Sequence, residues 1–169
     1  LNGGWKKWLA DGNQIEKKAN NLAHAVFSAE PDPKRLATKD FIAKRVDRDD
    51  FAIIDARTDE EYNGWALHGE KRGGHIKNAI SMNYKWFFNE NGTIRDYPAL
   101  KDLMKSHGVT PDKEVSAYGT RGVRSAMVYF TLRLMGYPKC SNYDGSLMEW
   151  SSDAALPMEA MSRYEKLVN

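Results

Sequence analysis

The sequence lacks most of the features that point to metal, redox or membrane chemistry. Its single cysteine, Cys140, allows no disulfide within the chain and does not distinguish a reducing from an oxidising compartment. The four histidines show no metal-ligand spacing: His24, His68, His75 and His107. No stretch approaches the ~20 apolar residues that a membrane span needs. We therefore predict no metal, no cofactor and no membrane span, and leave both cytoplasm and periplasm open.

The net charge of the chain is also small. A formal net charge of +2 is too small to indicate a nucleic-acid partner. The chain is 41% hydrophobic and 28% charged, with a mean hydropathy of −0.66. These values are typical of a soluble globular protein, and 169 residues suffice for one domain with its own core.

Strand and helix patterns alternate along the chain. Residues 51–54 form a continuous apolar run, typical of a strand buried on both faces, and residues 79–82 and 114–118 are further strand candidates. Thr58 and Glu61 are spaced as a capping box that opens a short helix. The alternation predicts an α/β fold with a central parallel sheet and helices on both faces.

Three longer helices are predicted. Residues 38–46 begin at Thr38 as the N-cap, and residues 98–107 have Pro98 at the first helical position and Gly108 at the C′ position. Residues 125–135 end at Gly136. Their apolar residues have the spacing of one helix face: Ala126, Met127, Phe130 and Leu134.

The stretch that carries chemistry is the loop of residues 118–125, YGTRGVRS, between the strand 114–118 and the following helix. Backbone N–H groups at a helix start can converge on an anion. Two arginines add full charges, and two glycines allow positive φ. The candidate anion-binding residues are Thr120, Arg121, Gly122, Val123, Arg124 and Ser125. The alternative is an ordinary strand-to-helix turn with solvated arginines.

These motifs resemble the rhodanese (thiosulfate sulfurtransferase) family, whose active loop runs Cys, four residues, Arg, then a small residue. Here Gly119, four residues, Arg124 and Ser125 match that order, and Gly119 takes the place of the nucleophilic cysteine. The resemblance is greatest to the second, normally catalytic domain of tandem sulfurtransferases. It implies that Gly119 and Arg124 mark the catalytic positions.

A second signature strengthens the resemblance. Residues 54–62, then 72–76, then 78–80 match the family's strand, Asp-x-Arg, Glu-Tyr, Gly-His-Ile and Ala-Ile pattern. Asp55 and Arg57 follow a strand, where they either support the active loop or form a structural ion pair. His75 is interpreted as a hydrogen-bonded packing residue. The polar insertion 63–72 is a candidate contact for a ligand or partner.

A repeat indicates how the chain is divided. Residues 1–8 and 143–150 agree in kind at five of eight positions. We predict that residues 1–12 are the tail of a preceding rhodanese module, 13–36 an interdomain linker, 37–157 the rhodanese domain and 158–169 a C-terminal helix or tail. The apolar middle of the linker suggests that it packs on the domain: Leu22, Ala25, Val26 and Phe27.

The missing cysteine leaves the enzymatic status open. In active members of the family a thiolate takes sulfane sulfur from thiosulfate and passes it to a thiophilic acceptor. With Gly119 the chain should lack this activity. One alternative is a domain that lost its nucleophile, naturally or by engineering, and still binds a small sulfur-containing anion. A second alternative is a domain that acts as the structural partner of an active repeat. A third alternative is a purely structural or docking domain whose loop binds no ligand.

Overall fold

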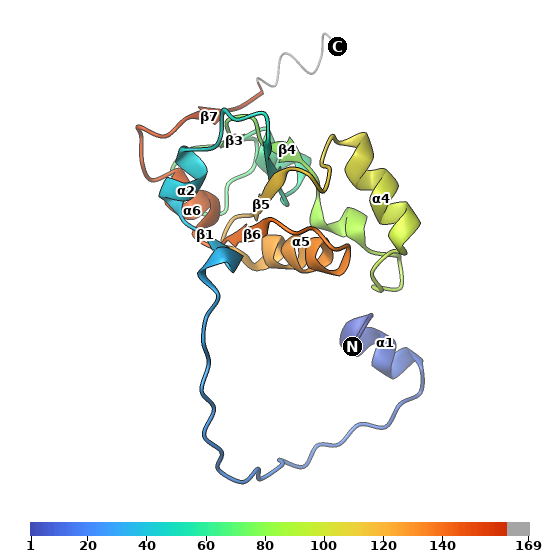
Figure 1. The fold of residues 1–169 in the computed structure, drawn as a ribbon. Helices are drawn as coiled ribbons and strands as arrows, with labels where there is room; N and C mark the ends of the chain where they lie inside the picture. Colours follow the sequence, from blue (N-terminus) through green and yellow to red (C-terminus); the bar gives the residue numbers. More distant parts are fainter. Residues whose placement is uncertain (162–169) are drawn as a thin grey trace.

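The computed structural model describes residues 1–161 and forms a parallel sheet with helices on both faces (Figure 1). The sheet strands are β1 (Leu36–Ala37), β2 (Phe51–Asp55), β4 (Ile80–Ser81), β5 (Glu114–Tyr118) and β6 (Cys140–Tyr143). Their order is β1-β6-β5-β2-β4, and every neighbouring pair is parallel. A small antiparallel pair joins β3 (His75–Ile76) to β7 (Met158–Glu159). The predicted α/β fold is confirmed.

The helical elements are α1 (Gly4–Ala10), η1 (Pro33–Arg35), α2 (Lys39–Ala43), α3 (Asp59–Tyr62), η2 (Tyr84–Phe87), α4 (Tyr97–Ser106), α5 (Val123–Leu134) and α6 (Ser146–Trp150). Two of the predicted N-terminal caps are confirmed. Thr38 accepts the N–H of Phe41, and Thr58 and Glu61 form the capping box. The actual N-cap of α4 is Asp96, so Pro98 lies at its second position.

Two apolar clusters fill the two faces of the sheet. On one face α4, α5 and η2 bury Leu100, Val128 and Phe87 against alternate residues of β2 and β5. On the other, α2 and α6 bury Ile42 and Trp150. All five residues of β2 are buried, as its unbroken apolar pattern predicts.

The helix α5 is confirmed, but its predicted apolar face is not the buried one. The residues that it buries are Ser125, Val128, Thr131 and Leu132. Met127, Phe130 and Leu134 lie instead on the exposed face, at 38%, 49% and 59% exposure. The small and hydroxyl-bearing side chains face the sheet because α5 packs closely on β5 and β6.

Two predictions about the chain ends need correction. The linker does not pack on the domain, since residues 11–32 are exposed throughout and Val26 is 91% exposed. Figure 1 shows this segment as an arc away from the body. The predicted C-terminal helix is wrong at Met158–Glu159, which form β7; residues 162–169 of that prediction lie outside the described residues. No helix within 1–161 is long and apolar enough to cross a membrane.

Candidate active-site loop

The loop 119–122 lies where β5 ends and α5 begins, at the carboxyl edge of the sheet. Gly122 is the N-cap of α5 and has φ 78°, a left-handed conformation that favours glycine. A Cβ at this position would approach the carbonyl oxygen of Asp144 to 2.9 Å. Gly122 is therefore needed both for the turn and for the close approach of the neighbouring loop.

The start of α6 holds the loop from one side. The hydroxyl of Ser146 accepts the N–H groups of Gly119 at 3.1 Å and Gly122 at 2.9 Å. The N–H groups of Leu147 and Met148 donate to the carbonyls of Gly119 and Thr120. These bonds fix the loop backbone at both of its glycines.

The remaining loop amides are unused by the protein. Within residues 1–161 no acceptor lies within hydrogen-bond reach of the backbone N–H groups of Thr120, Arg121, Val123, Arg124 and Ser125. The hydroxyl of Ser125 does not cap them, because it donates to the carbonyl of Gly122. Free N–H groups at the start of a helix of this length are a natural anion site.

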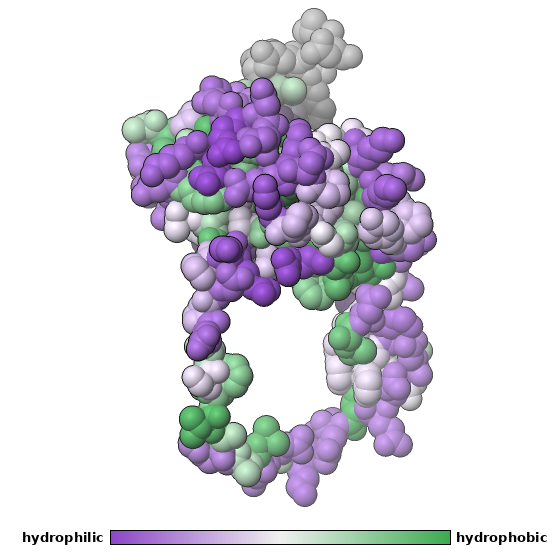
Figure 2. All heavy atoms as spheres, in the orientation of Figure 1, coloured by the Kyte–Doolittle hydropathy of each residue, from purple (hydrophilic) through white to green (hydrophobic). Residues whose placement is uncertain are grey.

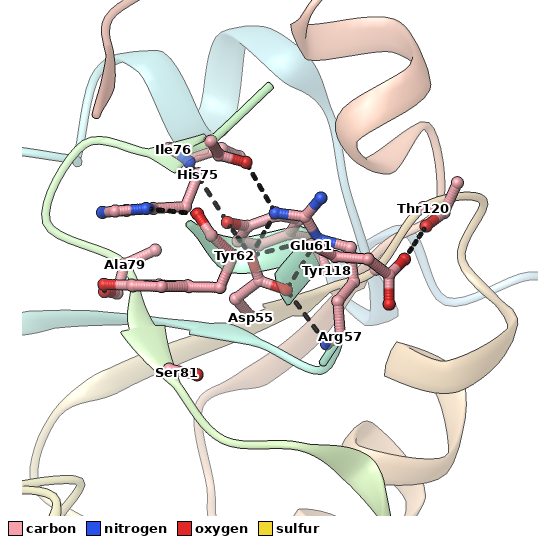
Figure 3. Close-up of polar contacts among 12 residues, drawn as sticks. Asp55, Arg57, Glu61, Tyr62, His75, Ile76, Ala79, Ser81, Tyr118 and Thr120 are labelled. Atoms are coloured by element: carbon pink, nitrogen blue, oxygen red, sulfur yellow. Dashed lines mark hydrogen bonds and ion pairs between the residues drawn. The ribbon is translucent and has the colours of Figure 1, made fainter. Parts of the chain in front are cut away.

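Glu61 of α3 clamps the arginine of the loop. Both carboxylate oxygens of Glu61 accept from Arg124, at 2.7 Å each, and Arg124 also donates to the hydroxyl of Thr120. Thr120 in turn donates to Glu61, and Figure 3 shows these two side chains pointing toward each other. Burial raises the pKa of Glu61, but the bonds from Arg124 and Thr58 outweigh it and lower the pKa to about 2.

Because Arg124 is paired, Arg121 is the loop's freer cation. No carboxylate in the described part of the chain forms an ion pair with Arg121, whose guanidinium reaches only the carbonyl of His68, at 3.5 Å. The imidazole of His68 lies 3.6 Å from Glu61. A pocket of about 260 Å³ opens here, lined by His68, Thr120, Arg121, Val123 and Arg124.

Gly119 is buried at the base of the loop and has no positive φ. A Cβ built there would meet nothing closer than 3.8 Å, the nearest atoms being Cβ of Arg124 and N of Ser125. These are ordinary van der Waals distances, so the backbone accepts a Cβ at this position without adjustment.

Asp55 and Arg57 stand beside the loop as a fully buried ion pair (Figure 3). Arg57 donates to both carboxylate oxygens of Asp55 and to the carbonyl of Gly74. The hydroxyl of Tyr118, the residue before the loop, donates to Asp55 at 2.6 Å and accepts the N–H of Ile76. Asp55 and Arg57 thus form a structural ion pair that Tyr118 contacts, and their support of the active loop stays a prediction.

His75 is also a packing residue, as predicted. Its ring stacks on Tyr62 with centroids 3.6 Å apart, and Nδ1 bonds the carbonyl of Tyr62. Cys140 begins β6, at the sheet edge opposite the loop, and burial raises the pKa of its thiol. No cluster of three or more potential metal ligands occurs within residues 1–161.

The sequence did not single out three residues of the site, namely Glu61, His68 and Ser146. The sequence indicates Glu61 only as half of a capping box and as part of the Glu-Tyr signature, and Ser146 only as part of the repeat. His68 lies in the insertion 63–72, which was expected to meet a ligand or partner; the structure brings this insertion to the loop.

At neutral pH, Glu61→Gln should lower the free energy of unfolding by about 2 kcal/mol. Breaking a fully buried ion pair costs ~3–5 kcal/mol, and the smaller value is expected here because Arg124 is partly hydrated. The folded pKa lies below the ordinary value of 4.5, so this stabilisation is complete above about pH 4.5 and is lost as pH falls toward 2. Urea unfolding at pH 7 and pH 3 measures it.

The control for this substitution is Asp102→Asn, which removes an exposed carboxylate of α4 and should leave the urea midpoint unchanged. A Glu61→Gln variant as stable as the parent at pH 7 would show that the ion pair contributes nothing. A deficit of the same size at both pH values would contradict the linkage to Glu61.

Residues 38–153 match the family described as "Rhodanese-like domain". The chain belongs to this family. The chain is 29% identical over 159 residues to a thiosulfate sulfurtransferase of Azotobacter vinelandii, covering 94% of this chain and 58% of the relative. It is 29% identical over 170 residues to the sulfur carrier protein TtuD of Thermus thermophilus, covering 94% and 60%.

Solved structures of EanB share the fold of this chain. The wild-type structure of EanB superposes with a TM-score of 0.85 at 27% identity, covering 96% of this chain and 40% of that one. A complex of an EanB variant with ergothioneine superposes with a TM-score of 0.88 at 28% identity, covering 96% and 41%. The chain thus spans about three-fifths of the two curated relatives' length and less than half of EanB.

Proposed function

We propose that this chain is a rhodanese-type domain of the sulfurtransferase family that keeps the anion-binding loop but lacks the nucleophile. The observation that carries the proposal is the loop itself: free amides, Arg121 at the pocket, and a Gly119 with room for a side chain. Family chemistry transfers sulfane sulfur from thiosulfate-like donors to a thiophilic acceptor. Glycine has no atom with which to attack the donor.

The loop residues would hold the donor anion rather than react with it. Arg121 supplies a charge that no carboxylate of the described residues neutralises, and the free amides of Thr120 and Val123 supply directed donors. Arg124, clamped by Glu61, positions Thr120 and keeps the loop rigid. The chain's own groups thus bind and orient the anion, and the missing step is formation of the persulfide.

The test is sulfur transfer from thiosulfate to cyanide by the chain and by Gly119→Cys, side by side. The parent should show no turnover above the uncatalysed rate. Turnover by the parent that Arg124→Ala abolishes would contradict the proposal.

Thiosulfate at millimolar concentration is expected to shift the amide NMR signals of residues 119–125 in the parent chain. Arg121→Ala should weaken this binding by about tenfold, since a charge-assisted bond contributes ~1.5 kcal/mol or more. Lys101→Ala, which removes an exposed cation of α4, is the matched control and should bind as the parent does. Unchanged signals in the loop would refute anion binding there.

A second candidate function is a non-catalytic partner-docking domain of a multi-rhodanese protein whose active cysteine lies in another repeat. It is favoured by the apolar residues that α5 exposes beside the loop, among them Val123 at 76% exposure. If Gly119→Cys shows no turnover and thiosulfate leaves the amide NMR signals of the loop unchanged, the docking function becomes the better explanation.

A further inference from the structure

The insertion 63–72 is a loop whose two ends are in direct contact. Its backbone consists of turns and irregular structure. Gly64, near its start, packs against the backbone of Gly73 and Gly74, just after its end, and a Cβ built on Gly64 would approach N of Gly74 to 2.7 Å. Gly64 and Gly74 also have positive φ, at 79° and 104°, which favours glycine. The base of the insertion is thus closed by glycine.

The end of the insertion is anchored on the segment that follows α6. The N–H of Lys71 donates to the hydroxyl of Ser151 at 3.0 Å. The guanidinium of Arg72 donates to four backbone carbonyls, those of Trp150, Ser151, Asp153 and Leu156. The tip at residues 67–69, in contrast, is exposed. The insertion therefore presents an accessible tip on a fixed base.

Glu70 supports the tip from inside the protein. Its side chain is 0% exposed although it is a carboxylate. One carboxylate oxygen accepts the N–H of His68, two residues earlier. The other lies 3.7 Å from Nη1 of Arg57, and neither of these two atoms has a hydrogen-bond partner among the described residues. The hydrogen bond of Glu70 thus goes to the backbone of His68 and fixes the turn that carries the imidazole.

The tip lies against the arginine of the anion loop. A Cβ built on Gly69 would meet Nη2 of Arg121 at 3.5 Å, and the same nitrogen donates to the carbonyl of His68 at 3.5 Å. The side chain of His68 is 61% exposed and lines the pocket together with Arg121 and Arg124. A ligand in the pocket can therefore reach the imidazole.

The pocket is small and polar. Its volume is about 260 Å³, and four of its five lining residues have polar or charged side chains. Hydrophobic side chains gather instead on the underside of the body, facing the N-terminal helix (Figure 2). The pocket therefore suits a small charged ligand, and its selectivity should depend on charge.

Four charged groups surround His68: Glu61 of α3, 3.6 Å from Nε2, Arg121 and Arg124 of the pocket, and Glu70 of the insertion. Glu61 and Arg124 compensate each other as an ion pair, which leaves Arg121 as the uncompensated charge of the pocket. A protonated imidazole adds a second positive charge. Two positive charges at one pocket match a doubly charged anion, because a charge attracts a dianion twice as strongly as a monoanion.

We propose that His68 is a specificity-determining residue, which makes the pocket favour doubly charged over singly charged anions, and that Glu70 is the positioning residue that holds it there. This rests on the proposed binding of anions by the loop. A histidine side chain gains its positive charge as pH falls from 8 to 5. The preference for dianions is therefore strong in mild acid and weak above neutral pH.

Thiosulfate and methanethiosulfonate test this proposal, because they have similar shapes and differ by one negative charge. Binding of each is measured from the amide NMR signals of residues 119–125 at pH 5.5 and 7.5, at constant ionic strength. One unit of ligand charge about 4 Å from an imidazolium changes affinity about fivefold in water. The preference for thiosulfate over methanethiosulfonate should therefore fall by about fivefold between the two pH values.

Variants assign this effect to individual residues. His68→Gln should show the same preference at both pH values, because glutamine does not titrate. His24→Gln, which removes an exposed histidine of the linker, is the matched control and should behave as the parent does. Glu70→Ala should lose the pH dependence although it retains His68. Glu70→Gln should keep it, because the amide oxygen can accept the same N–H.

Two results overturn the proposal: a preference in the parent that does not change with pH, or a full pH dependence in His68→Gln. Full pH dependence in a folded Glu70→Ala variant removes Glu70 from the positioning role, and the His68→Gln result decides the proposal even if Glu70→Ala does not fold. Absence of binding by both anions contradicts the proposed function itself. Binding with a pH-independent preference contradicts only the role of His68, so the two failures are distinguishable.

Discussion

Gly119→Cys is expected to give the chain thiosulfate:cyanide sulfurtransferase activity at least about 10³-fold above that of the parent, since loss of a nucleophile typically costs more than this. The backbone at Gly119 accepts a Cβ, with the nearest atom 3.8 Å away. A thiol there would lie beside Arg124 and the backbone N–H of Ser125 at the start of α5, and both favour a thiolate. The measurement is thiocyanate formed per unit time.

Gly119→Ser is the matched control, because it adds a side chain of nearly the same size that is a far weaker nucleophile. This variant should show no thiosulfate:cyanide turnover. Cys140→Ala in the Gly119→Cys background should keep the activity, because Cys140 starts β6 at the opposite edge of the sheet. Failure of Gly119→Cys to turn over, in a variant that folds as the parent does, would mean that the pocket no longer fits the donor.

The sequence predicted the scaffold well where local rules decide the outcome. The run 51–54 has few alternatives to a buried strand, and it is one. Thr58 and Glu61 cap α3 because both halves of a capping box lie within one turn. Parallel pairing follows from the alternation of strands and helices.

The sequence does not predict burial correctly where burial depends on which other element packs against a helix or segment. An apolar stripe predicts that a helix face is covered, but not by what. The periodicity on α5 selected Met127 and Phe130, whereas the sheet of this domain covers Val128 and Leu132. The apolar linker residues mislead in the same way. A pattern that predicts burial without a partner in the described chain is better interpreted as a possible interface.

The residue types of the loop predict an anion site, and anion binding stays a prediction. The electrostatics of the loop were not predictable, because Glu61 and Arg124 meet across 63 residues of sequence. The same holds for Ser146, 27 residues from Gly119. Such contacts depend on how α3 and α6 dock on the sheet, which no local pattern encodes. They separate the two arginines: Arg124 is paired with Glu61, whereas Arg121 forms no ion pair with a carboxylate of the described residues.

Asp55→Ala is expected to destabilise the chain by about 3–5 kcal/mol, the usual cost of breaking a buried ion pair from one side. Arg57 would keep its charge at 0% exposure, with Glu70 3.7 Å away as the nearest remaining carboxylate. Tyr118 would lose the acceptor of its hydroxyl, next to the loop. The measurement is the urea midpoint at pH 7, with the slope of the transition unchanged.

Two comparisons make this result specific. Asp50→Asn breaks the exposed pair with Arg48 and should leave the midpoint unchanged, because exposed ion pairs are screened by solvent. Asp55→Ala combined with Arg57→Met should be more stable than Asp55→Ala alone, because the uncompensated charge is gone. If Asp55→Ala costs no more than Asp50→Asn, the pair does not hold the fold together. Asp55 and Arg57 would then be better explained as residues kept for ligand chemistry at the edge of the loop.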